Sequence, residues 1–349
     1  MSMYALARSL LFRLDPETAH RWVVSGIGLA GRIHPVDQYV ADLWRGRLPP
    51  RPVRAMGLTF PNPVGVAAGL DKDVEAFDGL ALFGFGFIEL GTVTPLAQSG
   101  NPKPRMFRLI EHGALINRMG FNSKGLGHFL NRLGKTRQLA VTGINLGKNA
   151  KTPIENAVAD YINGLRAVYT AADYVTINIS SPNTQDLRSL QQDAALDRLL
   201  EALKEEQRRL ASDHQKYTPI AIKIAPDLND EQLVKIASAV VEHEVDGLVA
   251  TNTTTARAAS VASHCHAGES GGLSGRPLAD TAREKVIALR QSLPQAFPII
   301  GAGGIDDADS AIAMLDAGAN LIQIYTGLIY RGPSLLREIL KGMENASPQ

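Results

Sequence analysis

Eight short apolar segments, each followed by a helical or loop pattern, constrain the fold of this chain more than any other feature of its sequence. Several are rich in valine and isoleucine without polar alternation, which is typical of strands buried on both faces of a parallel sheet. The segments span residues 64–68, 87–91, 141–146, 174–179, 220–224, 247–251, 298–301 and 321–325. Helical patterns that begin at an acidic residue or a proline span residues 193–211, 230–243, 280–293, 306–317 and 333–344. Eight strand–helix units predict an α/β fold, a closed (β/α)8 barrel rather than an open sheet.

The length of 349 residues fits one such barrel with a small addition at the N-terminus. Single barrels of this kind often contain about 250 residues. We therefore assign residues 51–349 to the barrel and residues 1–50 to a helical extension and linker. Prolines at three positions within residues 48–53 cannot continue a helix and place the linker there. The stretch 92–139 is longer than one crossover, so we expect a small hairpin or extra loops in it.

The first fifty residues predict two amphipathic helices. Residues 4–14 carry leucines on one side of a helix and arginines elsewhere. A second helix is predicted over residues 16–32. Its start is well defined, because Asp15 can cap it and Pro16 suits its first position. Its apolar face is expected to consist of Ala19, Trp22, Val23, Ile27 and Ala30. The helices either cap the barrel or form an apolar mouth that dips into a lipid interface, and their residues alone leave both interpretations open.

Composition excludes several classes of function. A formal net charge of +1 gives no reason to expect a nucleic-acid partner. A single cysteine, Cys265, excludes an internal disulfide and an iron–sulfur cluster carried by this chain. The longest uncharged early run, residues 22–31, is about half of what crosses a bilayer, so we expect no transmembrane helix. We expect no bound metal, and a monomer, because no exposed apolar stripe on the barrel helices stands out.

Polar residues gather where the apolar segments end, and this edge is the catalytic face of a barrel. In chain order they are Lys72, Thr92, Asn145, Asn178, Ser181, Asn183, Lys223, Thr251, Asn252 and Thr253. Any one of them alone could be structural. Lys223 resists that interpretation, because it lies between Ile222 and Ile224 in mid-strand, where an unpaired ammonium is costly. It needs an anionic or strongly hydrogen-bonding partner.

Glycine-rich turns follow the last two strands, in residues 298–305 and 321–327. In barrels these two loops commonly bind phosphate through backbone N–H groups. The alternative is a pair of tight turns that need glycine for their conformation. Because both turns are present, and residues 271–277 could complete the same wall, the sequence predicts a phosphate site.

Taken together, these motifs resemble the dihydroorotate dehydrogenase family. The strings that carry the resemblance are AAGLDK (67–72), IELGTVTP (88–95), NRMGFN (117–122), NISSPNT (178–184), IKIAPDL (222–228), TNTT (251–254), GGLSGRPL (271–278) and GAGGI (301–305), in family order. NISSPNT and NRMGFN are the most specific. The N-terminal extension is similar to that of the quinone-using class, so the resemblance covers nearly the whole chain.

The resemblance implies FMN as the cofactor, with the following site residues. Flavin contacts would come from Ala68, Gly69, Lys72, Thr92, Asn145, Asn178, Lys223 and Thr251, and phosphate contacts from Gly275, Gly304, Tyr325 and Thr326. Dihydroorotate would be held by Lys72, Asn117, Asn178, Asn183, Asn252 and Thr253, with Arg118, Met119, Gly120 and Phe121 closing around it. Ser181 would take the substrate proton, whereas soluble relatives use a cysteine. A serine needs a hydrogen-bonded relay and an acidified substrate proton for this role.

The same resemblance implies orotate as the product, a membrane quinone as the final electron acceptor and a peripheral position on the cytoplasmic face of the inner membrane. The N-terminal helices would form the quinone entrance, with His20, Arg105 and Tyr325 as polar groups near its inner end. Two rival functions are a nicotinamide-dependent flavin barrel of the dihydropyrimidine or dihydrouridine type and a non-catalytic phosphate-binding barrel that docks on membranes.

Overall fold

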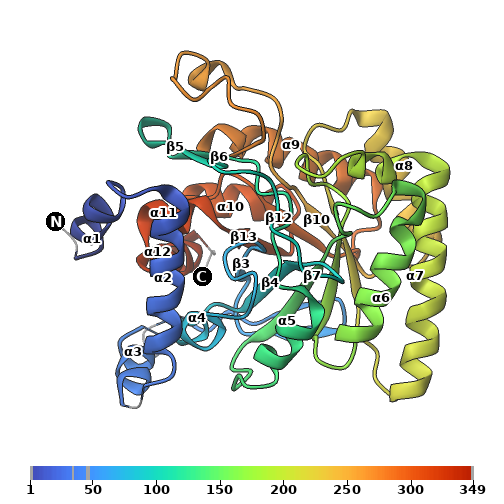
Figure 1. Cartoon of the computed structure of the whole chain (residues 1–349), viewed down its shortest axis with the longest axis horizontal. Helices are drawn as coiled ribbons and strands as arrows, with labels where there is room; N and C mark the ends of the chain where they lie inside the picture. The colour runs from blue at the N-terminus through green and yellow to red at the C-terminus, as the bar shows by residue number, and fades with distance from the viewer. Residues whose placement is uncertain (1–2, 34, 45–47, 347–349) are drawn as a thin grey trace.

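Eight parallel strands form the centre of the computed structural model, which describes residues 3–33, 35–44 and 48–346. They close in the order β10-β12-β13-β3-β4-β7-β8-β9. The strands are β3 (Val64–Val66), β4 (Phe87–Val93), β7 (Val141–Leu146), β8 (Tyr174–Asn178), β9 (Ile220–Ile224), β10 (Gly247–Ala250), β12 (Ile299–Ala302) and β13 (Leu321–Ile324). The first and last strands pair, with Ile322 opposite Val64, which closes the barrel (Figure 1). The predicted (β/α)8 fold is confirmed.

Helices follow the strands and surround the barrel (Figure 1). They are α4 (Phe77–Leu82), α5 (Gly125–Leu133), α6 (Ala157–Val168), α7 (Asp193–His214), α8 (Asp230–Glu242), α9 (Ala279–Ser292), α10 (Ala308–Asp316), α11 (Thr326–Arg331) and α12 (Ser334–Ala346). Side-chain caps explain two of the starts: Asn229 accepts from the backbone N–H of Gln232, and Asp307 accepts from that of Ser310. The inner faces are apolar and buried, which holds each strand end, and the side chains on it, in a fixed place.

The N-terminal extension contains three helices, one more than predicted: α1 (Met3–Leu11), α2 (Pro16–Ala30) and α3 (Val36–Trp44). They lie along one edge of the barrel, where α1 contacts α11 and both α2 and α3 contact α4 (Figure 1). Asp15 caps α2 as expected, because its side chain accepts from the backbone N–H of Thr18 at 2.9 Å. The third helix was missed because nine residues are too short a window for a periodic pattern.

The apolar face predicted for α2 is partly turned toward the barrel and partly exposed. Ala19 is buried, but Trp22 is 63% exposed and Val23 is 39% exposed. The helix packs through its small residues instead, since a Cβ at Gly28 would lie 2.1 Å from the backbone oxygen of Glu75. Close backbone contact on that side leaves the wide side chain of Trp22 on the outside of the extension.

Two smaller sheets cover the ends of the barrel. At the N-terminal end of the strands lies the hairpin of β1 (Val53–Ala55) and β2 (Leu58–Phe60), where the rings of Phe60 and Phe87 meet edge to face, 5.3 Å apart. In the predicted insertion, β5 (Met106–Leu109) and β6 (Ala114–Asn117) form the expected hairpin. An unpredicted strand from much later in the chain, β11 (Gly272–Gly275), pairs antiparallel with β6.

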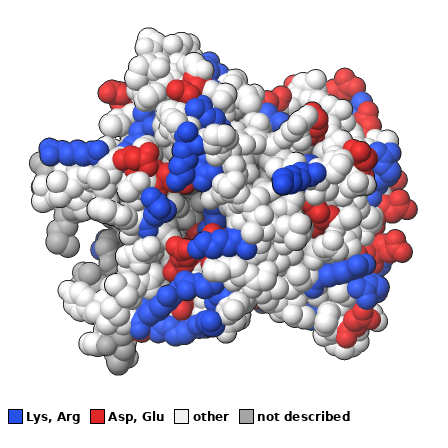
Figure 2. All heavy atoms as spheres, viewed as in Figure 1, with Lys and Arg blue, Asp and Glu red and all other residues white. Residues whose placement is uncertain are grey.

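Charged side chains of both signs are interspersed over the face shown in Figure 2, as the small net charge suggests. Exposed apolar side chains occur on the extension, where Leu6, Leu10, Trp22 and Leu29 are each more than half exposed. In the described part of the chain, no helix combines the length and the apolar character needed to cross a membrane.

Candidate active site

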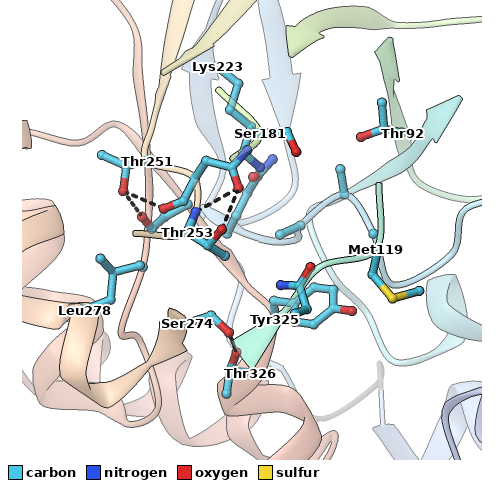
Figure 3. A pocket seen from close by; sticks show the side chains of 18 of the residues that line it. Thr92, Met119, Ser181, Lys223, Thr251, Thr253, Ser274, Leu278, Tyr325 and Thr326 are labelled. Carbon is cyan, nitrogen blue, oxygen red and sulfur yellow. Dashed lines mark hydrogen bonds between the residues drawn. The ribbon is translucent and has the colours of Figure 1, made fainter. Parts of the chain in front are cut away.

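A cavity opens at the C-terminal ends of the barrel strands, and we call it the central cavity (Figure 3). Of the predicted site residues, its lining includes Ala68, Gly69, Lys72, Thr92, Asn117, Met119, Gly120, Phe121, Asn178, Ser181, Asn183, Lys223, Thr251, Asn252, Thr253, Gly275, Gly304, Tyr325 and Thr326. The two predicted residues outside the lining are Asn145 and Arg118. The barrel thus brings together side chains that are far apart in the sequence.

Buried amides and hydroxyls connect the strand ends around this cavity. Thr92 Oγ1 donates to Asn145 Oδ1 at 2.5 Å, and Asn178 Nδ2 donates to the same oxygen at 3.1 Å. Ser180 Oγ donates to Asn178 Oδ1 at 3.1 Å, while Asn252 Nδ2 donates to Ser180 Oγ at 3.0 Å. Asn145 therefore fixes the amide orientation of Asn178 without lining the cavity itself.

Glu89, which the sequence analysis did not single out, is a fully buried carboxylate inside the barrel. Its donors are Asn145 Nδ2 at 2.8 Å, Tyr174 OH at 3.0 Å, Thr176 Oγ1 at 3.0 Å and Gln323 Nε2 at 2.6 Å. Amide nitrogens only donate, so this arrangement suits the charged form of the carboxylate. Sequence reasoning could have found it, because Glu89 interrupts an apolar strand in the same way as Lys223.

Two lysines reach the central cavity from different elements. Burial lowers the pKa of Lys223 on β9, and the charge of Glu89 offsets part of this shift. Burial also lowers the pKa of Lys72, after β3, to about 8, with the nearby Arg105 as a second cause. Lys72 Nζ donates to Asn122 Oδ1 at 2.6 Å. Because a buried ammonium is unfavourable, both groups favour an anionic ligand.

Ser181 lies on the loop after β8 and is buried at the wall of the central cavity. Its Oγ accepts from the backbone N–H of Asn183 at 3.2 Å. Asn183 Nδ2 in turn donates to the backbone oxygen of Asn117 at 3.2 Å, which connects this loop to the hairpin of β5 and β6. Nearby in sequence, Thr184 has a buried hydroxyl without a hydrogen-bond partner among the described residues.

Residues 117–121 follow β6 and cover one side of the central cavity. Met119, Gly120 and Phe121 line it as predicted. Arg118 differs from the prediction: its Nη1 donates to Glu269 at 2.6 Å, and its guanidinium lies 4.7 Å from the ring centroid of Phe107. The carboxylate of Glu269 and the face of the ring draw this charge away from the cavity.

Glycine turns shape the far end of the central cavity. Gly304 has a φ of 76°, and a Cβ there would lie 2.2 Å from Cα of Ala279. Gly275 has a φ of 95°, and its Cβ would lie 2.2 Å from the backbone oxygen of Gly113. Only glycine fits at either place. Thr326 Oγ1 donates to Ser274 Oγ at 2.9 Å at this end (Figure 3), so hydroxyls and open backbone turns meet where the sequence predicted phosphate.

A second cavity, of about 280 Å³, lies between the N-terminal extension and the barrel, and we call it the apolar cavity. Its lining is mostly aliphatic and aromatic and includes Leu11, Phe12, Val23, Ile27, Phe83 and Leu328. The few polar side chains in the lining are those of Tyr4, Arg8, His20 and Arg108. Burial lowers the pKa of His20 to about 4, with Lys72 as a second cause, so its ring is neutral at pH 7.

The three polar residues expected at the quinone entrance have different positions. His20 lines the apolar cavity, and Tyr325 lines the central cavity. Arg105 lines neither: its guanidinium donates to the Glu17 carboxylate on α2, because that buried charge is its strongest available partner. Arg108 takes the place in the lining that was expected for Arg105.

Comparison with known proteins decides the family. Residues 52–346 match the family model described as "Dihydroorotate dehydrogenase". The chain belongs to the dihydroorotate dehydrogenase family. A curated family member from Burkholderia multivorans (strain ATCC 17616 / 249), named dihydroorotate dehydrogenase (quinone), is 54% identical over 342 residues, covering 98% of this chain and 97% of its own. One of the same name from Burkholderia pseudomallei (strain 1106a) is 54% identical and covers 98% of both chains.

Solved structures agree with this assignment to the dihydroorotate dehydrogenase family. A crystal structure of the Eimeria tenella enzyme in complex with ferulenol aligns with a TM-score of 0.82 and 38% identity, covering 95% of this chain and 91% of that one. The ligand-free Eimeria tenella structure gives a TM-score of 0.79 at 39% identity, covering 91% and 94%. The resemblance found in the motifs is therefore confirmed over nearly the full length.

Proposed function

We propose that this chain oxidises (S)-dihydroorotate to orotate in pyrimidine biosynthesis and passes the electrons through FMN to a membrane quinone. The observation that carries the proposal is a single cavity in which Lys72, Lys223 and Ser181 meet the asparagine amides at the strand ends. The 54% identical relatives bear the name dihydroorotate dehydrogenase (quinone). Oxidation of dihydroorotate removes a hydride from ring carbon 6 and a proton from carbon 5, so the site needs a hydride acceptor and a base.

The residues of the central cavity fit a flavin mononucleotide. Gln323 lines the cavity, and its Oε1 is a buried acceptor without a partner among the described residues. Gly275 and Gly304 line the cavity and let its backbone turns pack closely against Gly113 and Ala279, and backbone turns of this kind can bind a phosphate through their N–H groups. Lys223 would lie beside the ring edge that becomes negative on reduction. Bound FMN would accept the hydride at its N5 atom.

The side chains at the mouth of the cavity suit the substrate. Each ring amide of dihydroorotate offers a donor and an acceptor, and so does each of the asparagines Asn117, Asn178, Asn183 and Asn252 that line the cavity. Lys72 is the cation available to the substrate carboxylate. Orientation by several polar contacts at once is what holds carbon 6 and carbon 5 in place for reaction.

Ser181 is the residue available to take the carbon 5 proton. The N–H of Asn183 donates to Ser181 Oγ, which stabilises negative charge on that oxygen as it gives up its own proton. The buried hydroxyl of Thr184 can serve as the next group in a proton relay, through a water molecule. The carbonyl next to carbon 5 acidifies the substrate proton, which completes the requirements for a weak base.

The apolar cavity supports the quinone half of the reaction. A lipophilic quinone needs an apolar passage, and this cavity lies between α1, α2 and the barrel. Exposed apolar residues of the extension, such as Leu10 and Trp22, suit a lipid interface. We further propose that the protein is a monomer on the cytoplasmic face of the inner membrane, and the apolar cavity and these exposed residues support its peripheral contact with lipid.

The experiment that tests this function is anaerobic mixing of the purified protein with dihydroorotate, followed through the visible flavin spectrum, and then addition of a short-chain quinone. We expect the yellow colour to bleach and the quinone to restore it. A yellow protein that does not bleach would overturn the substrate. A colourless protein that FMN cannot reconstitute would overturn the cofactor.

A further inference from the structure

The barrel interior holds one carboxylate, and its neighbours are arranged around it. Of the eight barrel strands, only β4, β8 and β9 carry titratable side chains, namely Glu89, Tyr174 and Lys223. Glu89 accepts from side chains on β7, β8 and β13, so one residue connects strands on different sides of the barrel. A buried charge is tolerated only when hydrogen bonds and a counter-charge compensate it.

Glu89 determines which way the side-chain amide of Gln323 is turned. Gln323 Nε2 donates to Glu89 at 2.6 Å, and this leaves Gln323 Oε1 buried without a partner among the described residues. An unpaired buried acceptor is unfavourable. Rotating the amide by half a turn would place its oxygen against the carboxylate, which is worse. The carboxylate therefore keeps an acceptor free in a residue that lines the central cavity.

Glu89 also determines which way the amide of Asn145 is turned. Its Nδ2 donates to Glu89, so its Oδ1 must face Thr92 and Asn178 and accept from both. Asn178 and Thr92 line the central cavity. Glu89 thus controls, through one intermediate residue, which atoms of the cavity wall donate and which accept.

We propose that Glu89 is a positioning residue of the cofactor site: its carboxylate fixes the Asn145 and Gln323 amides, and with them the donors and acceptors of the cavity wall, and it is the buried counter-charge of Lys223. This inference rests on the proposed function, because it assumes that a flavin occupies the central cavity. Glu89 does not line that cavity and acts only through its neighbours.

Electrostatics support the same arrangement. Burial lowers the pKa of Lys223, and Glu89 is the charge that raises it again. Burial raises the pKa of Tyr174 far above its usual range, so its hydroxyl remains a donor to Glu89. The other titratable groups of the cavity wall are Lys72 and Tyr325. Neither lies on a strand of the barrel interior, and Lys223 remains the ammonium that Glu89 compensates.

The test is the midpoint potential of the bound flavin as a function of pH, measured on the holoprotein between about pH 6 and 10. A protonated Lys223 stabilises the reduced, anionic ring, so the titration of the lysine adds a bend to the plot (hereafter the bend), besides the one caused by ionisation of the reduced flavin itself. Lys223→Met should remove the bend that comes from the lysine. In Glu89→Gln we expect Lys223 to bind its proton about tenfold more weakly, which moves the bend about one pH unit lower. An unmoved bend would overturn the proposal.

Two further variants separate charge from packing. Glu89→Asp keeps the charge and should leave the bend within about half a pH unit of the wild type. Glu206→Gln makes the same chemical change at a buried carboxylate on the outer helix α7 and should leave the bend in place. A shift of the bend in Glu206→Gln as large as that in Glu89→Gln would count against the inference.

A folding failure of Glu89→Gln would also be informative. The double variant Glu89→Gln with Lys223→Met removes both charges and should then recover folded protein in a thermal unfolding assay. No recovery would overturn the pairing of the two residues. A wild-type protein that binds no flavin would defeat the proposed function instead, whereas a flavin-bound protein with an unmoved bend defeats only this inference.

Discussion

Arg105 and Glu17 are joined by two hydrogen bonds, from Nε to Oε2 at 3.2 Å and from Nη2 to Oε1 at 2.8 Å. Glu17 lies in the first turn of α2, and Arg105 directly precedes β5, so the pair ties the extension to the barrel. Their side chains are only 11% and 6% exposed. Burial alone would raise the pKa of Glu17, but hydrogen bonds from Arg105 and Lys103 lower it overall. The carboxylate therefore stays charged at neutral pH.

Replacing Arg105 by methionine should destabilise the protein by about 3 kcal/mol, because a buried carboxylate loses its main partner. Chemical denaturation measures the loss. Asp213→Asn is the matched control, since Asp213 pairs with Arg209 at 2.7 Å but both side chains are about half exposed. That change should cost less than about 1 kcal/mol. Equal losses in the two variants would mean that burial of the Arg105 pair contributes nothing.

Ser181→Ala should slow flavin reduction by dihydroorotate by about 10²- to 10⁴-fold while leaving the flavin bound, because only the proton acceptor is removed. Anaerobic stopped-flow absorbance follows the reduction directly. The control is Ser189→Ala, at a serine in the short 3-10 helix after this loop whose hydroxyl donates to the backbone oxygen of Asp186, and it should reduce at the normal rate. Near-normal reduction in Ser181→Ala would remove this residue as the base.

The affinity for dihydroorotate should fall in alkaline solution because of Lys72. Burial lowers the pKa of Lys72 to about 8, so the ammonium is present below that pH and is lost above it. We expect kcat/KM to decrease about tenfold per pH unit above pH 8, through loss of the charge that attracts the substrate carboxylate. Lys72→Arg, which stays charged, should be weaker overall but lack this decrease. A flat wild-type profile up to pH 9.5 would contradict the role of Lys72.

Deletion of residues 1–45 should impair quinone reduction more than flavin binding, because α1 and α2 line the apolar cavity but not the central one. Quinone turnover is measured with lipid vesicles and without them, and the flavin content is read from the absorbance of the purified variant. The truncated protein should also lose its response to lipid. Unchanged quinone turnover would exclude the extension as the entrance.

The barrel was predictable because its strands are buried on both faces and therefore read as unbroken apolar runs. The predicted segments 141–146 and 220–224 coincide with β7 and β9 to the residue. The helix α3 and the strands β1, β2 and β11 were not predicted, because three to nine residues carry too little periodicity. Periodicity placed Trp22 on the apolar face of α2 but could not say whether that residue packs inward, because the close contact at Gly28 decides which side approaches the barrel.

Within the site, position at the end of a barrel strand pointed to lining residues such as Lys72, Asn178 and Thr251, since parallel strands end at one edge. Asn117 and residues 119–121 lie outside the barrel strands and were named from the family resemblance. Arg118 and Arg105 do not line the cavities in which they were predicted. Each guanidinium pairs with a carboxylate instead, and these partners, Glu269 and Glu17, lie in distant parts of the sequence. Glu89 carried a signal in the sequence, a charge within an apolar strand, but its partners, Gln323 among them, come from four hydrogen bonds made across the barrel. Pairings of this kind are set by tertiary structure alone.

The pairing of β11 with β6 has a consequence for how the site forms while the chain is being synthesised. Asn117, which lines the central cavity, lies opposite Gly272 in that sheet. A ribosome must therefore release most of the chain before this wall can be completed, and the pairing of β13 with β3 must wait even longer. Chains that end before β11 contain Lys72 and Lys223 but lack part of the wall of the central cavity. We therefore expect the activity to depend on the last part of the polypeptide, because that part completes both the barrel and the wall of its cavity.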